Sequence, residues 1–104
     1  MFLVVFRNRK RADIDQAAYD AEAERMQQLA AAQPGYLGFK SYCADDAEVI
    51  ALSEWADEAA ALAWRKAAEH RAAQARGRSD YYEDYTLFAC NEPRVHRFSR
   101  EDAA

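Results

Sequence analysis

The sequence predicts an α+β domain with the element order β-α-β-β-α-β. Four segments are rich in β-branched and aromatic residues, two segments favour helix, and turn-forming residues separate them. This order is typical of the ferredoxin-like arrangement, in which an antiparallel four-stranded sheet carries both helices on one face.

The first half of the chain predicts a strand, a helix and a second strand. The strands cover residues 2–10, FLVVFRNRK, and residues 36–43, YLGFKSYC. A helix is expected over residues 15–33, with Asp13 and Asp15 as candidate N-caps and a Pro-Gly pair after its last turn. One face of this helix carries four residues at helical spacing: Tyr19, Ala23, Met26 and Ala30.

The second half predicts a strand, a helix and a final strand. After a short acidic turn, residues 49–55, VIALSEW, form the third strand. A second helix is expected over residues 57–76, with its first residue, an aspartate, as the N-cap and Gly77 after its end. A long last strand is expected over residues 81–95, interrupted or ended by Pro93.

The length and composition indicate one compact domain. The chain has 104 residues, of which 51% are apolar and 31% charged. We expect residues 1–98 to form the domain and residues 99–104 a C-terminal tail.

The net charge of −4 argues against a nucleic-acid partner. The first apolar run is too short to span a membrane, and RNRKR follows it, which is the wrong order for a signal peptide. A cytoplasmic protein without membrane association is therefore expected.

Several common kinds of site are not indicated by the sequence. Cys43 and Cys90 stand in neither a C-x-x-C nor a zinc-ligand spacing, so we expect reduced and mostly packed thiols. The two histidines, His70 and His96, are not at a ligand spacing, which argues against a metal site. There is no P-loop, Gly-rich dinucleotide fingerprint or nucleophile elbow, so no bound nucleotide cofactor is implied.

The strands carry more apolar residues than one sheet face needs. Consecutive apolar positions occur at residues 2–6, 49–52 and 87–90. The strands of a sheet with one solvent-exposed face would instead alternate apolar and polar residues. Two helices cover only one face, and the other would expose more apolar surface than soluble monomers usually do. We therefore expect an obligate homodimer in which two sheets pack together about a two-fold axis, forming an α+β barrel.

A ligand pocket would then lie between the helices and the sheet, and Trp64 belongs to that space. Five alanines fall within roughly 60° of it around the helix: Ala60, Ala61, Ala67, Ala68 and Ala75. Either Trp64 fills the gap that they leave, as a core residue, or it forms one wall of a cavity.

Two polar residues are further candidates for this space. Asn8 continues the apolar row of the first strand, while Arg7 and Arg9 point the other way. Its amide either binds a ligand oxygen or meets water at the end of the strand. His70 lies roughly 120° around the helix from Trp64 and is either a structural residue or a general base. The segment RNRKR is interpreted as a solvated basic turn that can also help to anchor an acidic substrate.

Four segments, taken together, resemble a known family. They are FRNRK in the first strand, AAAQPGYLGFKSY around the second, SEWADEAAALAWRKAAEH into the second helix and AQARGRSDYYEDY before the last strand. In this order they cover the chain from Phe2 to about Phe98 and resemble the antibiotic biosynthesis monooxygenase (ABM) domain superfamily.

The resemblance implies a dimeric α+β barrel with one pocket per subunit. Members with known activity include cofactor-independent oxygenases that convert phenolic or anthrone-like aromatics to quinones, and haem-degrading monooxygenases. Both types use an Asn on the first strand and a Trp on the second helix, which match Asn8 and Trp64 here. These two would hold the substrate oxygens, with His70 as a possible base. Three aromatic residues are then expected to line the substrate pocket: Phe6, Tyr19 and Phe39.

The haem-degrading type differs from this sequence at its proximal histidine, which follows the helix Trp by about three turns. Here that neighbourhood holds Ala72, Ala73 and Gln74, and His70 comes roughly one turn too early. A glutamine is a poor haem ligand compared with an imidazole, so the sequence disfavours haem degradation.

The preferred function is therefore a cofactor-independent monooxygenase that acts on a small aromatic or polyketide-type substrate. The alternative is a non-catalytic, dimeric protein of the same fold that holds a small hydrophobic ligand or takes part in a stress response.

Overall fold

The structure confirms the predicted α+β fold and its element order. The computed structural model describes residues 1–74 and 81–101, with side chains for all of these except residues 70–74. The elements are β1 (Phe2–Lys10), α1 (Gln16–Ala31), β2 (Tyr36–Cys43), β3 (Val49–Trp55), α2 (Glu58–Gln74) and β4 (Tyr82–Asn91). The expected end of the second helix, near Gly77, lies outside the described residues. No helix among the described residues is both long and apolar enough to cross a membrane.

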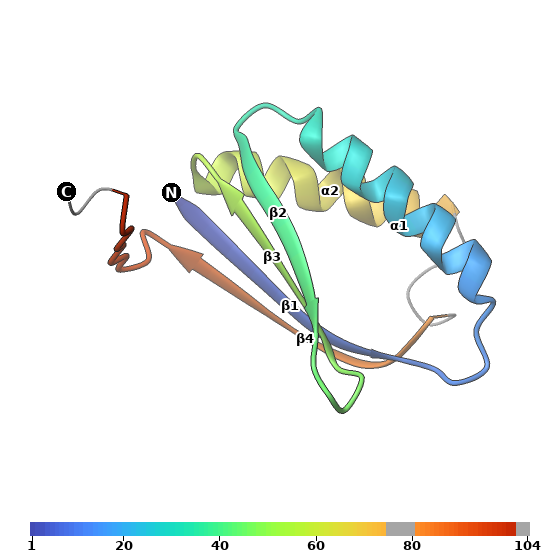
Figure 1. Ribbon diagram of the computed structural model, residues 1–104. Coiled ribbons are helices and arrows are strands. Elements are labelled where there is room, and N and C mark those ends of the chain that lie inside the picture. Colours follow the sequence, from blue (N-terminus) through green and yellow to red (C-terminus); the bar gives the residue numbers. More distant parts are fainter. Residues whose placement is uncertain (75–80, 102–104) are drawn as a thin grey trace.

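The four strands form one antiparallel sheet in the order β2-β3-β1-β4. Both helices lie on the same face of this sheet, with α1 in contact with β2 and α2 in contact with β1 and β3 (Figure 1). The register on that face pairs β1 with β3 as follows: Phe2 with Trp55, Val4 with Ser53, Phe6 with Ala51 and Asn8 with Val49. The edge strand β4 lies next to β1, and its first residue, Tyr82, meets Tyr19 of α1.

Aspartates cap both helices. The Oδ1 of Asp15 accepts a hydrogen bond of 3.1 Å from the backbone N–H of Ala18, so Asp15 rather than Asp13 is the N-cap of α1. The Oδ1 of Asp57 accepts one of 2.8 Å from Ala60 at the start of α2. Each carboxylate satisfies an N–H group that has no partner within its helix, which explains why the helices begin where they do.

The last strand is shorter than the sequence predicts. β4 ends at Asn91 rather than near residue 95, because Glu92 has a φ of +51°, which interrupts the extended backbone. Pro93 follows and has no N–H group for a strand ladder. The N–H of Glu92 instead donates to the carbonyl of Met1 at 2.9 Å.

Two smaller expectations are also corrected. Arg7 and Arg9 lie within β1, so the basic segment is strand rather than turn, and each arginine forms an ion pair. Cys43 and Cys90 are both free, but they are exposed rather than packed. Cys43 ends the edge strand β2, and Cys90 lies on the edge strand β4, where no helix covers it.

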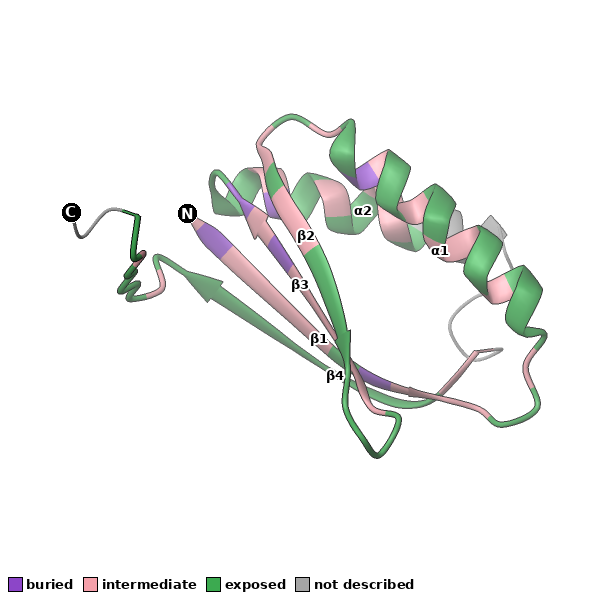
Figure 2. Ribbon diagram, in the orientation of Figure 1, coloured by how far each residue is buried: buried purple, intermediate pink, exposed green. Residues whose placement is uncertain are grey.

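The buried core is small and lies at one end of the sandwich. Among the described residues, four apolar residues are buried: Phe2, Ala30, Trp55 and Ala61. Figure 2 shows that buried positions are few and that β4 is exposed along most of its length. The Cα radius of gyration is 15.1 Å, compared with about 13 Å for a compact chain of this length. Much apolar surface on this chain is therefore left uncovered.

The sheet face turned away from the helices is apolar and open. By register its apolar and weakly polar residues are Leu3, Val5, Tyr42, Ile50, Leu52, Thr86, Phe88 and Cys90, and the charged Lys40 and Glu54 lie among them. Two ion pairs border it, one between Arg7 and Glu48 at 3.2 Å and one between Arg9 and Asp46 at 2.6 Å. We call this surface the open sheet face.

Candidate functional site

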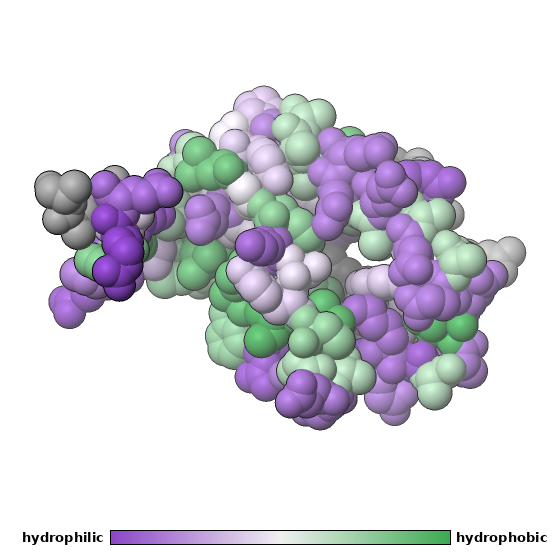
Figure 3. Space-filling model, in the orientation of Figure 1, coloured by the Kyte–Doolittle hydropathy of each residue, from purple (hydrophilic) through white to green (hydrophobic). Residues whose placement is uncertain are grey.

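A cavity of about 790 Å³ lies between the two helices and the sheet. In the space-filling view the surface is hollowed between the helix layer and the strands (Figure 3). The volume falls within the range of roughly 300–1,000 Å³ that is typical of small-molecule sites. The face of α1 predicted from its spacing lines this cavity, as do Phe6 and Phe39 from the strands. The cavity is therefore large enough for a multi-ring ligand and has mostly apolar walls.

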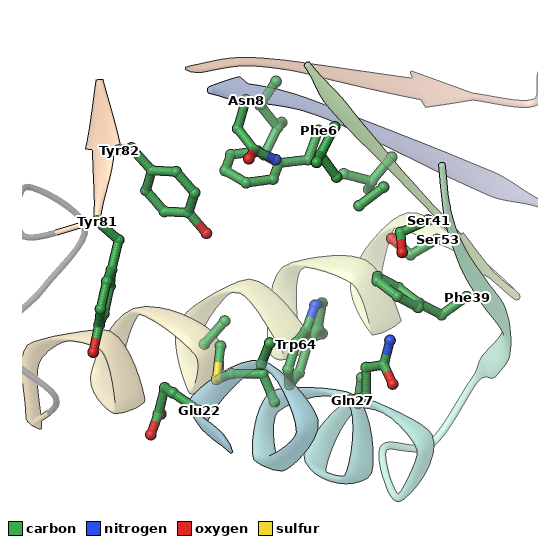
Figure 4. A pocket seen from close by; sticks show the side chains of 18 of the residues that line it. Phe6, Asn8, Glu22, Gln27, Phe39, Ser41, Ser53, Trp64, Tyr81 and Tyr82 are labelled. Atoms are coloured by element: carbon green, nitrogen blue, oxygen red, sulfur yellow. The ribbon is translucent and has the colours of Figure 1, made fainter. Parts of the chain in front are cut away.

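Asn8 is the most buried polar residue of this cavity. Its side chain is 2% exposed, and its Oδ1 accepts no hydrogen bond from the described residues. Leaving a buried amide oxygen without a donor costs about 1–3 kcal/mol. Figure 4 shows that Asn8 and Trp64 point into the same space from opposite sides. A ligand O–H or N–H group that donates to Asn8 would satisfy this oxygen.

Trp64 is at once part of the core and part of the cavity wall. Its ring stacks on Trp55 with centroids 5.9 Å apart and an angle of 20° between the planes. Trp55 is fully buried and meets Tyr36 edge-on at 5.7 Å. The other side of Trp64 lines the cavity, and its indole nitrogen points inward in Figure 4. Trp64 is therefore both a core residue and a cavity wall, the two alternatives that the sequence left open.

Tyrosines close the opposite end of the cavity. Phe6 meets Tyr82 edge-on with centroids 5.5 Å apart, and the hydroxyls of Tyr19 and Tyr82 lie 3.5 Å apart. The ammonium group of Lys10 lies 4.9 Å from the centre of the Tyr19 ring. Figure 4 places Tyr82 at one end of the cavity and Phe39 at the other. A flat aromatic ligand would therefore meet ring faces and ring edges along its length.

His70 lies on α2, but its side chain is outside the described part of the structure. The geometry therefore brings together Asn8 and Trp64 of the three residues proposed for chemistry. Phe6, Tyr19 and Phe39, which we expected in the substrate pocket, all line the cavity.

Sequence reasoning overlooked Ser53 and Trp55. Both lie on β3 and face the helices, and the indole N–H of Trp55 donates to the Ser53 hydroxyl oxygen at 3.0 Å. The sequence pattern that could have identified them is the alternation along the strand, because every second residue lies on the same face: Val49, Ala51, Ser53 and Trp55. It was hidden because the run from Val49 to Leu52 is apolar at every position.

The shifted pKa values lie outside the cavity. The hydrogen bond from Arg9 lowers the pKa of the Asp46 carboxyl, and the same contact raises the pKa of Arg9. Both residues belong to the border of the open sheet face. In the described ranges, no three His, Cys, Asp or Glu side chains gather in a way that suits a metal ion.

The fold and cavity define a small α+β domain with a cavity on the helix side of its sheet. The family model for antibiotic biosynthesis monooxygenases matches residues 1–76, and the chain belongs to this family. The Bacillus subtilis (strain 168) protein YqjZ, which is described as uncharacterized, is 41% identical over 80 residues. The match covers 77% of this chain and 70% of YqjZ.

Solved structures share the same fold. The solved structure of Rv0793 from Mycobacterium tuberculosis has a TM-score of 0.73 at 16% identity, and the match covers 94% of this chain and 98% of Rv0793. SnoaB from Streptomyces nogalater, a cofactor-independent oxygenase, has a TM-score of 0.65 at 17% identity, with 95% of each chain covered. At these identities the likeness establishes the fold.

Proposed function

We propose that this chain is a cofactor-independent monooxygenase that oxidises a small aromatic or polyketide-type substrate in the cavity. The observation that carries the proposal is the buried Oδ1 of Asn8, which has no donor among the described residues and faces an aromatic-lined space. Membership of the monooxygenase family and the shared fold with SnoaB, itself a cofactor-independent oxygenase, support it.

The proposed reaction converts an activated methylene group, as in an anthrone, to a ketone. One oxygen atom of O₂ enters the new carbonyl, and the other leaves as water with the two hydrogens of the methylene. The four electrons that reduce O₂ come from the substrate, which supplies them after it loses its first proton. The protein needs only to remove or polarise that proton, orient the ring and exclude water.

The residues of the cavity suit these tasks. Asn8 accepts a hydrogen bond from a substrate hydroxyl, and the Trp64 indole N–H, which points inward, donates to a substrate oxygen. Phe6 and Phe39 bound the flat ring system from the sheet side. His70 is the proposed base, since a neutral imidazole nitrogen can accept a proton.

Oxygen uptake with anthrone tests this function. The wild-type protein is expected to consume one O₂ per anthrone and to release anthraquinone. Asn8→Leu removes the acceptor for the hydroxyl of the enol form of anthrone and is expected to lower kcat/KM by about 10- to 100-fold. Asn91→Leu is the matched control, because Asn91 is an exposed asparagine on β4, and it is expected to leave the rate unchanged. His70→Gln is expected to lower the rate, because a glutamine amide cannot accept the proton.

The same experiment separates the oxygenase from a binding protein. Anthrone that binds without O₂ uptake above the uncatalysed rate would contradict the oxygenase and favour a non-catalytic ligand-binding protein. An equal loss of rate in Asn8→Leu and Asn91→Leu would remove Asn8 from the proposed role.

We also propose that the protein is a homodimer joined through the open sheet face. Leu52 and Phe88 lie side by side with Val5 on that face, and no element of the described chain covers them. Four buried apolar residues make a small core for a chain of this length, so pairing would bury the surface that the helices leave open. The cavity, on the opposite face of the sheet, stays available to a ligand.

A further inference from the structure

Ser53 has a hydroxyl whose orientation is restricted by its neighbour. It lies on the helix side of β3, lines the cavity and is 8% exposed. The indole N–H of Trp55 can only donate, so in their 3.0 Å hydrogen bond the Ser53 oxygen must accept. The hydroxyl hydrogen of Ser53 therefore points away from Trp55.

No acceptor for that hydrogen exists among the described residues, since the bond to Trp55 is the hydrogen bond that Ser53 makes there. Asn8 lacks the opposite kind of partner, because its buried Oδ1 accepts no hydrogen bond from the described residues. One wall of the cavity thus offers a free donor and a free acceptor. Both residues are more than nine-tenths buried, and both line the cavity.

The two groups lie at different ends of the cavity floor. In the register of β1 and β3, Asn8 is paired with Val49 and Ser53 is paired with Val4. Asn8 and Ser53 therefore lie four strand positions apart along the sheet. At about 3.3 Å per residue this corresponds to about 13 Å along the sheet. Phe6 and Ala51 occupy the row between them, and Figure 4 places Ser53 beside Phe39, at the far end from Tyr82. A single ligand oxygen cannot contact both groups.

We propose that Ser53 is a second ligand-binding residue, whose hydroxyl donates to a carbonyl oxygen at one end of an elongated aromatic ligand. A hydroxyl group at the other end of the same ligand donates to Asn8. This inference rests on the proposed function of the cavity and narrows its substrate to a flat, multi-ring hydroxy-ketone. Trp55 is a positioning residue, because it orients the Ser53 hydroxyl and stacks on Trp64.

Three aromatic probes of similar size test the inference by calorimetric titration. Flavone carries only the carbonyl, flavone with a para-hydroxyl on its phenyl ring carries both groups, and para-(naphthyl)phenol carries only the hydroxyl. Ser53→Ala is expected to weaken the two carbonyl probes by about 3- to 10-fold and to leave naphthylphenol unchanged. Asn8→Ala is expected to weaken the two hydroxyl probes and to leave flavone unchanged.

Matched variants separate ligand contact from structural damage. Ser99→Ala removes a serine hydroxyl after β4, outside the cavity lining, and is expected to change none of the three affinities. Ser53→Thr keeps a hydroxyl and is expected to retain carbonyl binding. Trp55→Phe keeps Ser53 but removes the N–H that orients it, so a smaller loss confined to the carbonyl probes is expected.

The possible outcomes separate this inference from the function on which it rests. If Ser53→Ala weakens all three probes equally, the assignment of Ser53 is overturned while the pocket stands. If none of the probes binds the wild-type protein, the aromatic pocket itself is overturned, and both proposals fail.

Discussion

Gly35 shows how one residue positions the helix that carries Trp64. It has a φ of +83°, and a Cβ built on it would lie 2.6 Å from the Cβ of Ala60 on α2. Its carbonyl also accepts a 2.7 Å hydrogen bond from the N–H of Ala56. The turn after α1 is thus pressed against the first turn of α2, which only glycine allows at this φ and this distance.

Gly35→Ala is expected to lower the free energy of unfolding by more than about 1 kcal/mol, because it adds left-handed strain and a steric clash. Urea unfolding followed by circular dichroism measures the change. Gly38→Ala is the control, since nothing lies within 4 Å of a Cβ at Gly38, and it is expected to be neutral or stabilising.

The clash can be separated from the backbone strain. In an Ala60→Gly background the neighbouring Cβ is gone, so Gly35→Ala should cost less there than in the wild type. An identical cost in both backgrounds would show that Ala60 does not limit this position.

Asn8 and Ser53 show what residue patterns convey and what they omit. Alternation along β1 correctly placed Asn8 on the face of Phe6, because strand side chains alternate whatever the rest of the fold does. The bond between Ser53 and Trp55 depends on side-chain rotamers set by packing against Trp64, and no spacing rule contains that information.

At the scale of elements, the turn between β2 and β3 is held by two arginines of β1. Arg9 donates to the backbone carbonyl of Asp46 at 2.9 Å and to its carboxylate at 2.6 Å, and Arg7 pairs with Glu48. The N–H of Glu48 also donates to the Asp46 carboxylate at 3.1 Å. These contacts hold a hairpin in which Ala47 adopts a φ of +71°.

The Asp46 contact predicts a pH dependence of stability. Arg9 lowers the pKa of the Asp46 carboxyl in the folded state, so its contribution is fully present above the unfolded value of about 3.9. The contribution is lost as the pH falls through the lower folded pKa. The urea midpoint of wild type should therefore exceed that of Asp46→Asn at neutral pH, and the difference should vanish in strong acid.

Asp45→Asn is the control for that measurement, because Asp45 is exposed in the same turn and has no hydrogen bond or ion pair within the described ranges. Since the Arg9 pair is exposed, added salt should reduce its contribution. A difference between wild type and Asp46→Asn that persists unchanged in strong acid would contradict the assignment.

The observed strand bounds show how far sequence patterns predict the elements. β1, β2 and β3 match their predicted residues, because each apolar run is bounded by a polar or turn-forming segment. β4 was predicted to run to residue 95 or to end at Pro93, and it ends at Asn91, because the left-handed φ of Glu92 is not visible in the composition of the segment.

At the scale of the whole molecule, Phe88 and Leu87 lie on opposite faces of β4, so substitutions at these two residues can test which sheet face forms the dimer interface. Phe88 is 49% exposed on the open sheet face, and Leu87 is 42% exposed on the helix side. Wild type is expected to elute with twice the 11.8 kDa mass of one chain in light scattering at micromolar concentration. Phe88→Glu is expected to give monomers, because it buries a charge in the proposed interface.

Leu87→Glu is expected to remain dimeric, since Leu87 lies on the other face at nearly the same exposure. A wild-type protein that is monomeric at micromolar concentration would contradict the homodimer. Dissociation by Leu87→Glu but not by Phe88→Glu would place the interface on the helix side instead.

The sequence by itself determined the order of the elements, the bounds of three strands, the N-cap of the second helix and the side of the sheet on which Asn8 lies. These follow from local periodicity, turn chemistry and capping, which depend on neighbours along the chain. Only the tertiary structure decided that helices and sheet enclose a cavity rather than a filled core, and that Ser53 meets Trp55 beneath Trp64. Such features arise from how the helices pack over the sheet and which rotamers that packing permits, and a linear pattern does not contain those distances.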